Sequence, residues 1–278
     1  MSSVALVTGA NQGLGLSLVR GLARTLGEDS TVYLTARDPE RGRAAVKQLR
    51  AEGLNPRLHL LDLRDEASVE ALAGTIRAEH GGVDIVIQNA AARISKDVPF
   101  PAQVAEFVDT NNHGTTRMIN AFRPLLNDSA RFLVVASSFS SLRNLPRPLH
   151  GRFDVSRMSL ADVDGVMADY ARQVESGRAA AEGWPDWINI PSKIGQVASM
   201  RVLARELADE REDRDILVNA VCPGLIDTDA SRPWFDDMSG AASPDQGAVD
   251  VVRLATLPAG TLAPYGELVQ YRKIIPWV

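Results

Sequence analysis

The 278-residue sequence predicts an α/β fold in which a doubly wound parallel sheet lies between two layers of helices. Short apolar runs alternate with longer segments whose apolar residues recur at helical spacing. The short runs are continuously apolar, which is typical of strands buried on both faces of a parallel sheet. Crossovers between such strands place helices on both faces, so we expect ligands at the carboxyl ends of the strands.

Each element can be assigned in order along the chain. The predicted strands are residues 4–8, 31–36, 57–61, 83–89, 131–138 and 216–222, with a last strand near 266–271. The predicted helices between them are residues 13–26, 39–52, 65–80 and 102–126. Because no internal repeat or linker interrupts this order, we expect one domain over residues 1–278.

Two segments depart from the alternation. Residues 139–183 form an insertion with its own helix signal, in which Ser159 and Asp162 resemble a capping pair before an apolar stripe. A surface loop is the alternative interpretation, although loops this long are usually functional when they carry secondary structure. Residues 229–248 are rich in Gly, Ser, Pro and Asp, and we expect them to form a mobile substrate flap before a helix. The stripe consists of Val163, Val166, Met167 and Tyr170.

The amino-acid composition argues against several classes of function. A net charge of −5 without a basic stripe argues against nucleic-acid binding. One cysteine and four scattered histidines predict no disulfide and no metal site. No apolar run approaches the roughly 18 residues of a membrane span, and the first strand begins too early for a signal peptide. A metal-free cytoplasmic protein acting on a small molecule is therefore expected, with no membrane partner.

A glycine-rich turn, TGANQGLG at residues 8–15, directly follows the first predicted strand and opens the first helix. Such glycines let the backbone turn tightly and approach a pyrophosphate at a helix N-terminus, as in Rossmann-type dinucleotide sites. The alternative is an ordinary turn between a strand and a helix. The residues predicted to bind the cofactor here are Gly9, Asn11, Gln12, Gly13, Leu14 and Gly15.

The ends of the next two strands bear on which dinucleotide binds. Arg37 ends the second strand and Arg41 follows one helical turn later, so both can pair with the 2′-phosphate of NADPH. Asp38 keeps NAD open as an alternative, because an acid there can bind ribose hydroxyls. Asp62, followed by Leu63, ends the third strand and either accepts a bond from adenine or caps the next helix.

With these motifs in place, the chain resembles the short-chain dehydrogenase/reductase superfamily, and most closely its monomeric carbonyl reductases. The resemblance covers nearly the full length. In that subfamily the insertion covers the surface through which other members tetramerise, which implies a monomer here. The supporting stretches are TGANQGLG, TARDPERG, LLDL, QNAA at 88–91, TNNHGT at 110–115, VVASS at 134–138, EGWP and SKIG within 182–195, and NAVCPGLIDTD at 219–229.

The resemblance implies roles for several residues. Asn89 and Ala90 match the stretch beside the adenosine ribose, although alanine stands at 91 where glycine is expected. Asn111 matches an asparagine that holds a water in a proton relay. Ser138 matches the serine that donates a hydrogen bond to the substrate oxygen, and Lys193 matches the lysine that binds the nicotinamide ribose. The residues that resemble the carboxamide-binding loop are Pro223, Gly224, Ile226 and Thr228.

The resemblance fails at one position, because the catalytic tyrosine of the family falls four residues before Lys193, where Asn189 stands. An amide can donate a hydrogen bond to an oxygen but has no proton to release near neutral pH. Asn189 either contacts substrate or caps its own helix by binding the amide of Ser192, since asparagine is a strong N-cap. General acid catalysis contributes roughly 10²–10⁴ in rate, so its loss is a large effect.

These features predict an NADPH-dependent reductase that transfers hydride to a C=N bond, or to an activated C=O or C=C bond, of a bulky small molecule. Such acceptors need little acid from the enzyme, and secondary metabolism is a plausible setting. The alternative is a nucleotide-binding scaffold or a non-redox cyclising catalyst on the same fold. Phe139, Trp187 and Trp234 are predicted to line an aromatic substrate pocket, whereas Trp184 is expected to serve packing.

Overall fold

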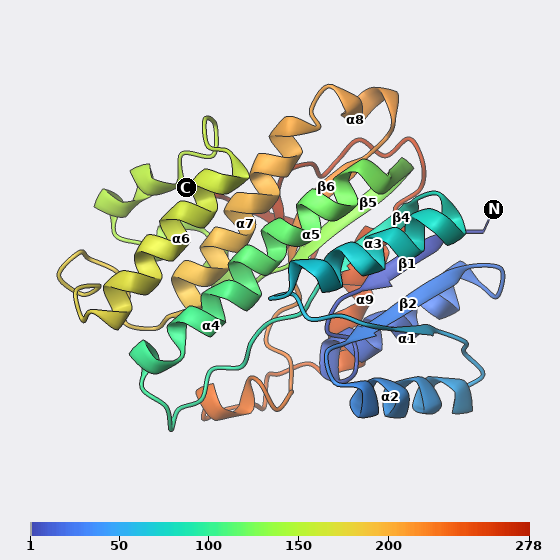
Figure 1. Ribbon diagram of the computed structural model, residues 1–278, viewed down its shortest axis with the longest axis horizontal. Coiled ribbons are helices and arrows are strands. Elements are labelled where there is room, and N and C mark those ends of the chain that lie inside the picture. The colour runs from blue at the N-terminus through green and yellow to red at the C-terminus, as the bar shows by residue number, and fades with distance from the viewer. Residues whose placement is uncertain (1) are drawn as a thin grey trace.

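The computed structural model, which describes residues 2–278, confirms the predicted α/β fold with one sheet between two helical layers (Figure 1). The strands follow the spatial order β3-β2-β1-β4-β5-β6-β7-β8, and all neighbours are parallel except β7 and β8. The strands are β1 (Val4–Val7), β2 (Thr31–Ala36), β3 (Arg57–Leu60), β4 (Val83–Gln88), β5 (Leu126–Val135), β6 (Leu217–Cys222), β7 (Leu268–Gln270) and β8 (Lys273–Ile275).

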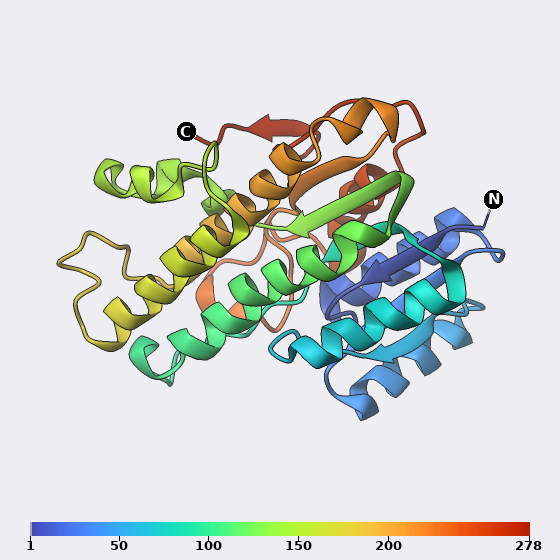
Figure 2. The ribbon, with the colours of Figure 1, turned by 45° about the horizontal axis from the view of Figure 1, so that its top comes forward.

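The helices divide between the two faces of the sheet. One layer contains α1, α2 and α9, and the other contains α3, α4, α5 and α7, with α6 packed outside α4 and α7 (Figure 2). The bounds are α1 (Gly13–Leu26), α2 (Pro39–Ala51), α3 (Glu66–His80), α4 (Val104–Val108), α5 (Gly114–Phe122), α6 (Leu160–Glu175), α7 (Asn189–Glu206), α8 (Glu210–Asp213) and α9 (Pro244–Ala255).

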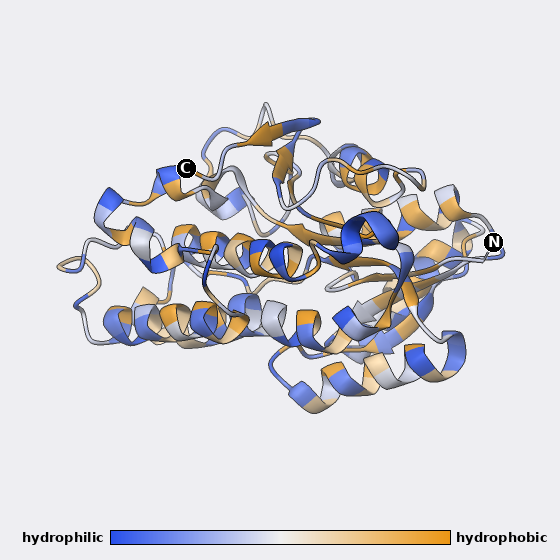
Figure 3. Ribbon diagram, turned by 90° about the horizontal axis from the view of Figure 1, so that it is seen from above, coloured by the Kyte–Doolittle hydropathy of each residue, from blue (hydrophilic) through white to orange (hydrophobic). Residues whose placement is uncertain are grey.

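The hydrophobic core has two parts, one on each face of the sheet. Apolar strand residues fill both parts, and the helices turn their apolar stripes toward them (Figure 3). The expectation of strands buried on both faces is wrong for β3. Because β3 is an edge strand, the side chains of Arg57 and Leu60 remain exposed.

The predicted helix over 102–126 is interrupted. α4 ends at Val108, and a π-helical turn over Asp109–His113 precedes α5. Strand β5 also ends at Val135 rather than at residue 138, because Ser137 and Ser140 form a capping box that starts a short 3₁₀ helix. Ser138 therefore lies on a turn just beyond its strand.

The insertion contains the predicted helix rather than only a surface loop. Ser159 and Asp162 form a capping box at the start of α6, and Val163, Met167 and Tyr170 are fully buried. α6 packs against α4 and α7, as Figures 1 and 2 both show. The insertion thus covers the outer surface of these two helices.

The C-terminal part differs from its prediction in two details. The flap expected over 229–248 ends at residue 243, because Ser243 and Gln246 form a capping box that begins α9. Strand β8 was not predicted, and it folds back against β7 through Tyr271 and Arg272, whose φ angles are 48° and 64°. Since neither residue is glycine, the sequence carries no common turn signal there.

Candidate active site

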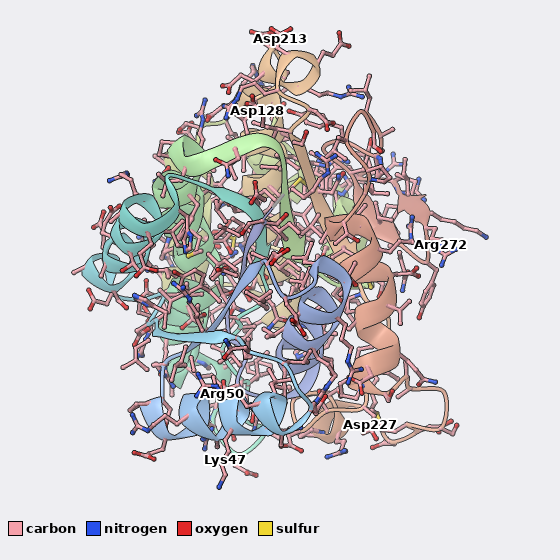
Figure 4. All side chains as sticks on the ribbon, turned by 90° about the vertical axis from the view of Figure 1, so that its right-hand side faces the viewer. Lys47, Arg50, Asp128, Asp213, Asp227 and Arg272 are labelled. Carbon is pink, nitrogen blue, oxygen red and sulfur yellow. The ribbon has the colours of Figure 1, made fainter. Side chains whose placement is uncertain are left out.

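Two adjoining cavities open at the carboxyl ends of the strands, where the fold predicts a ligand. The larger, of about 710 Å³, follows β1, β2 and β4, and the smaller, of about 370 Å³, follows β5 and β6. They share lining residues that include Leu14, Arg93 and Thr228. Figure 4 shows this end of the sheet at Asp227 and the opposite end at Asp128 and Asp213.

The glycine turn forms the floor of the larger cavity and requires its glycines. A Cβ atom on Gly15 would lie 2.4 Å from the carbonyl oxygen of Gly9, and one on Gly9 would lie 2.8 Å from Cα of Ala90. Gly9 and Gly13 also have φ angles of +61° and +52°, which favour glycine. At this turn the cavity is therefore lined by backbone atoms that no side chain covers.

The N-terminus of α1 at this turn lacks a side-chain cap. Gln12 is the N-cap residue but makes no capping hydrogen bond, and the first turn of α1 contains no acidic residue. The side chains of Asp38, Asp65, Ser159 and Ser243 cap α2, α3, α6 and α9, whereas α4, α5, α7 and α8 also lack a side-chain cap. The uncapped amide groups beside the cavity fit a pyrophosphate anion.

Two arginines lie where the adenosine end of a dinucleotide would project. Arg37 and Arg41 both line the larger cavity; Arg37 lies 3.8 Å from a carboxylate oxygen of Glu106, and the Arg41 guanidinium has no partner among residues 2–278. Asp38 accepts hydrogen bonds from the amides of Arg41 and Glu40, which hold its pKa below the usual range. Its carboxylate is thus already engaged in capping α2.

Four other residues predicted to bind the cofactor also line the larger cavity, but with different local roles: Asp62, Leu63, Asn89 and Ala90. Both oxygens of Asp62 accept bonds from Arg64, which lowers the pKa of Asp62, and α3 is capped by Asp65. The interpretation of Asp62 as that cap is therefore wrong. The Asn89 amide donates to the carbonyl oxygens of Thr8 and Gly9, at 2.9 and 3.2 Å. Leu63 and Ala90 contribute to the wall.

Three of the predicted catalytic residues line the smaller cavity together: Ser138, Asn189 and Lys193. The Ser138 hydroxyl and the Asn189 amide make no hydrogen bond to residues 2–278, so both polar groups remain available to a ligand. Nζ of Lys193 donates to the carbonyl oxygen of Val135 at 3.1 Å. Burial lowers the pKa of Lys193 to about 8.

Asn189 is not the helix cap that the sequence allowed as an alternative. It is the first residue of α7, Ile188 occupies the N-cap position, and no side-chain capping bond is present. A turn already begins upstream, because the amide of Ile190 donates to the carbonyl oxygen of Trp187. Pro191 fits this first turn, where its missing amide costs no helix hydrogen bond. The Asn189 side chain is left at the cavity wall.

No tyrosine lines either cavity within residues 2–278. Tyr33 donates to Glu79 of α3, Tyr170 is buried against Trp184, and Tyr265 donates to a backbone carbonyl. Tyr271 comes nearest, since its hydroxyl lies 2.0 Å from where a Cβ on Gly224 would stand. It packs on that backbone from outside the cavity.

Asn111 and Pro223 do not line a cavity. Oδ1 of Asn111 accepts from the amide of Ala92 at 2.8 Å, and its Nδ2 donates to Oγ of Ser192 at 3.2 Å. The buried side chain thus joins the loop after β4 to α7, and the relay role implied by resemblance stays a prediction. Gly224, Ile226 and Thr228 do line the smaller cavity, directly after β6.

An aromatic wall closes the smaller cavity, as predicted for Phe139, Trp187 and Trp234. The rings of Phe139 and Trp187 are 5.2 Å apart edge to face, and those of Trp187 and Trp234 are 5.7 Å apart at 34°. Trp184 lies elsewhere, and its Nε1 donates to Gln173, which confirms its packing role. Residues from three separate segments therefore form one apolar surface.

Sequence reasoning missed several lining residues, including Arg93, Phe107 and Cys222. Arg93 follows β4 and Cys222 ends β6, so their positions at the carboxyl ends of strands were the available signal. Arg93 and Lys193 are the charged residues that line the smaller cavity, and no Asp or Glu among residues 2–278 lines it. Arg93 is exposed and lies 3.7 Å from a carboxylate oxygen of Asp229, so Lys193 is the cation of this aromatic cavity that has no carboxylate partner.

Within residues 2–278, no group of three or more His, Cys, Asp or Glu side chains has a metal-binding arrangement. Over the same residues, no helix has the length and apolar character needed to cross a membrane.

Comparison with known proteins shows relatives over the whole length. Residues 3–147 match the short chain dehydrogenase family. The chain is 38% identical over 278 residues to carbonyl reductase (NADPH) 1 of Bos taurus, covering 99% of this chain and 98% of the relative. It is 37% identical over 280 residues to carbonyl reductase (NADPH) 3 of Rattus norvegicus, covering 99% of each.

Two solved structures share the fold. The structure of salutaridine reductase from Papaver somniferum superposes with a TM-score of 0.81 at 25% identity, covering 96% of this chain and 99% of that one. Menthone neomenthol reductase from Mentha piperita gives a TM-score of 0.78 at 25% identity, covering 97% and 99%.

Proposed function

The chain belongs to the short-chain dehydrogenase family, and from that premise we propose that it is an NADPH-dependent reductase of a bulky small molecule. Relatives named as NADPH carbonyl reductases support the cofactor, as do the uncapped N-terminus of α1 and the free guanidinium of Arg41. Asp38 is engaged in capping α2, which disfavours the NAD alternative.

The observation that carries this proposal is the meeting of Ser138, Asn189 and Lys193 at one cavity beside the glycine turn. A bound dihydronicotinamide supplies hydride. The Ser138 hydroxyl and the Asn189 amide donate hydrogen bonds to the acceptor oxygen, and an oxyanion donor of this kind is worth roughly 10²–10³ in rate. The aromatic wall excludes water and orients a flat substrate.

The charge of the smaller cavity indicates which class of hydride acceptor it favours. Lys193 lines it without an opposing carboxylate, whereas Arg93 pairs with Asp229, so the cavity stabilises negative charge through Lys193. Hydride addition to a carbonyl or a conjugated C=C bond creates an oxyanion, whereas a protonated imine enters as a cation. We therefore favour C=O and conjugated C=C acceptors over the C=N bond that the sequence also allowed.

The proposal includes a monomer, because α6 covers α4 and α7. It also treats Asn189 as the substitute for the family tyrosine, supported by its place four residues before Lys193 on α7 and at the cavity wall. In this arrangement the enzyme polarises the acceptor oxygen without a phenol.

The test is NADPH oxidation with a panel of aromatic ketones, enones, quinones and cyclic imines. We expect turnover of the first three and weaker turnover of the cationic imines. Asn189→Tyr should raise kcat for unactivated ketones, because it adds a phenol at the position of the family's general acid. Tight NADPH binding without NADPH oxidation by any acceptor would instead support the scaffold alternative. Turnover of the cationic imines alone would contradict the preference for acceptors that become oxyanions.

A further inference from the structure

Reduction of a ketone leaves an oxyanion that must receive a proton, and this cavity offers few donors. Of its lining residues, only Lys193, Cys222 and Arg93 carry a proton that can dissociate. An arginine stays protonated at all relevant pH values. Burial raises the pKa of the Cys222 thiol, whose sulfur accepts backbone hydrogen bonds from Ser138 and Gly224. Lys193 is the donor that remains.

We propose that Lys193 itself protonates the substrate oxygen, in addition to any contact with the cofactor; the inference rests on the reductase function proposed above. Its ammonium group has three N–H donors, and one is occupied by the carbonyl oxygen of Val135. The other two have no partner among residues 2–278 and lie at the cavity that Ser138 and Asn189 also line. These two polar groups position the oxygen next to the ammonium.

The charges around Lys193 are consistent with this role. Cys222 on β6 and Arg93 after β4 are the other ionisable groups at the cavity, and neither is a carboxylate. On elements packed against α7, Asp109 pairs with Arg117 and Asp164 pairs with His113, both outside the cavity. Burial lowers the pKa of Lys193 to about 8; no carboxylate at the cavity offsets this effect, and only Cys222 acts in the opposite direction. An acid of that strength is protonated at neutral pH and still able to release its proton.

The proton and electron balance is complete. Hydride from the reduced nicotinamide forms the new C–H bond, and the π electrons of the C=O bond move to oxygen. Oxygen takes a proton from Nζ of Lys193, which leaves a neutral amine. Solvent returns a proton to that amine before the next turnover, so no further reactant is required.

The first experiment measures the acid directly in the free protein. The sequence contains four lysines, and Lys47, Lys96 and Lys273 are exposed (Lys47 lies on the outer side of α2 in Figure 4). Protein with isotope-labelled lysine should show one side-chain NMR signal that titrates near pH 8, assigned by its absence in Lys193→Arg. A Lys193 titration at the ordinary lysine value of about 10.4 would overturn the proposal.

The second experiment separates proton donation from cofactor binding. Lys193→Arg keeps a cation but is a very weak acid. A ketone becomes a strongly basic alkoxide, whereas a quinone becomes a weakly basic phenolate that hardly needs the donor. We expect kcat for the ketone to fall about 10²-fold more than kcat for the quinone. Equal losses would show that Lys193 serves only the cofactor.

The pH dependence adds a third readout. For ketone reduction by the wild type, kcat should fall as pH rises through about 8, because Lys193 loses its proton there, and this decrease should be absent in Lys193→Arg. If the decrease in kcat persisted in Lys193→Arg, or disappeared in Cys222→Ala, another group would supply the proton and the proposal would be overturned. Failure of all NADPH oxidation would contradict the reductase function, whereas quinone turnover with an ordinary Lys193 titration would contradict only this inference.

Discussion

The two cavities at the carboxyl end of the sheet are built in different ways. The larger is shaped by backbone at the glycine turn and at the uncapped start of α1, with charged side chains around its edge. The smaller is shaped by side chains, chiefly Phe139, Trp187 and Trp234, that arrive from separate segments. Backbone shape tolerates few residue types, whereas an aromatic wall can be assembled in many ways, so the two should respond differently to substitution.

The largest expected effect comes from adding one carbon to the turn. Gly15→Ala places a Cβ 2.4 Å from the carbonyl oxygen of Gly9 and 2.7 Å from the side-chain nitrogen Nδ2 of Asn89. The turn must move, so we expect no measurable NADPH binding by calorimetry and a loss of about 1–3 kcal/mol in the free energy of unfolding.

The matched control is Gly74→Ala, in the middle of α3 where a Cβ meets no atom within 4 Å. It should leave NADPH binding unchanged and stabilise the fold by about 0.5–1 kcal/mol, as alanine does in a helix. Normal NADPH affinity in Gly15→Ala would show that the backbone of the turn does not define the larger cavity.

A smaller effect is expected at the charged edge of the same cavity. Replacing both Arg37 and Arg41 by methionine removes two guanidinium groups that lie at the larger cavity. Charge-assisted hydrogen bonds contribute about 1.5–3 kcal/mol each, so the Kd for NADPH should rise at least about 10-fold. The Kd for NADH, which lacks the 2′-phosphate, should hardly change.

Arg43→Met serves as the control for that pair. Arg43 is exposed, pairs with Glu40 and does not line the cavity. Its substitution should affect neither Kd. An equal loss of NADPH and NADH binding in the Arg37 and Arg41 double variant would argue against a phosphate-specific contact and restore the NAD alternative.

The same contrast explains what the sequence could predict. The succession of strands and helices along the chain follows from local patterns. The glycine turn, Arg37 and Lys193 could also be placed, because each lies at the end of a strand or in the first turns of a helix. β8 escaped prediction because its turn uses Tyr271 and Arg272 with positive φ angles. The cap proposed for Asn189 was wrong because α7 begins one residue earlier, which no local propensity indicated.

Residues of the smaller cavity were harder to foresee for a related reason. Arg93 and Phe107 lie in segments with no motif, and only the folded chain brings them beside Cys222. The aromatic wall was predicted from position alone, at the entrance of α7 for Trp187 and in the flap for Trp234. Side chains contributed by distant segments depend on packing, which the pattern of one sequence does not specify.

The smallest expected effect is at that wall. Trp234 is only partly buried and lies in the flap, where its ring is 5.7 Å from Trp187 and 6.5 Å from Phe100. Trp234→Leu should raise KM for a flat aromatic ketone about 5–10-fold, since a stacked aromatic pair is worth about 0.5–1.5 kcal/mol beyond its buried area. KM for an aliphatic ketone of similar size should change less, and the Kd for NADPH should stay constant.

Trp277→Leu is the comparison variant, because Trp277 stacks with Arg201 and lies outside both cavities. It should leave the KM of both ketones unchanged in steady-state assays. If Trp234→Leu weakened aromatic and aliphatic ketones equally, the ring would act as bulk that closes the flap rather than as a stacking surface. The smaller cavity would then select substrates by size, and its aromatic composition would have no specific partner.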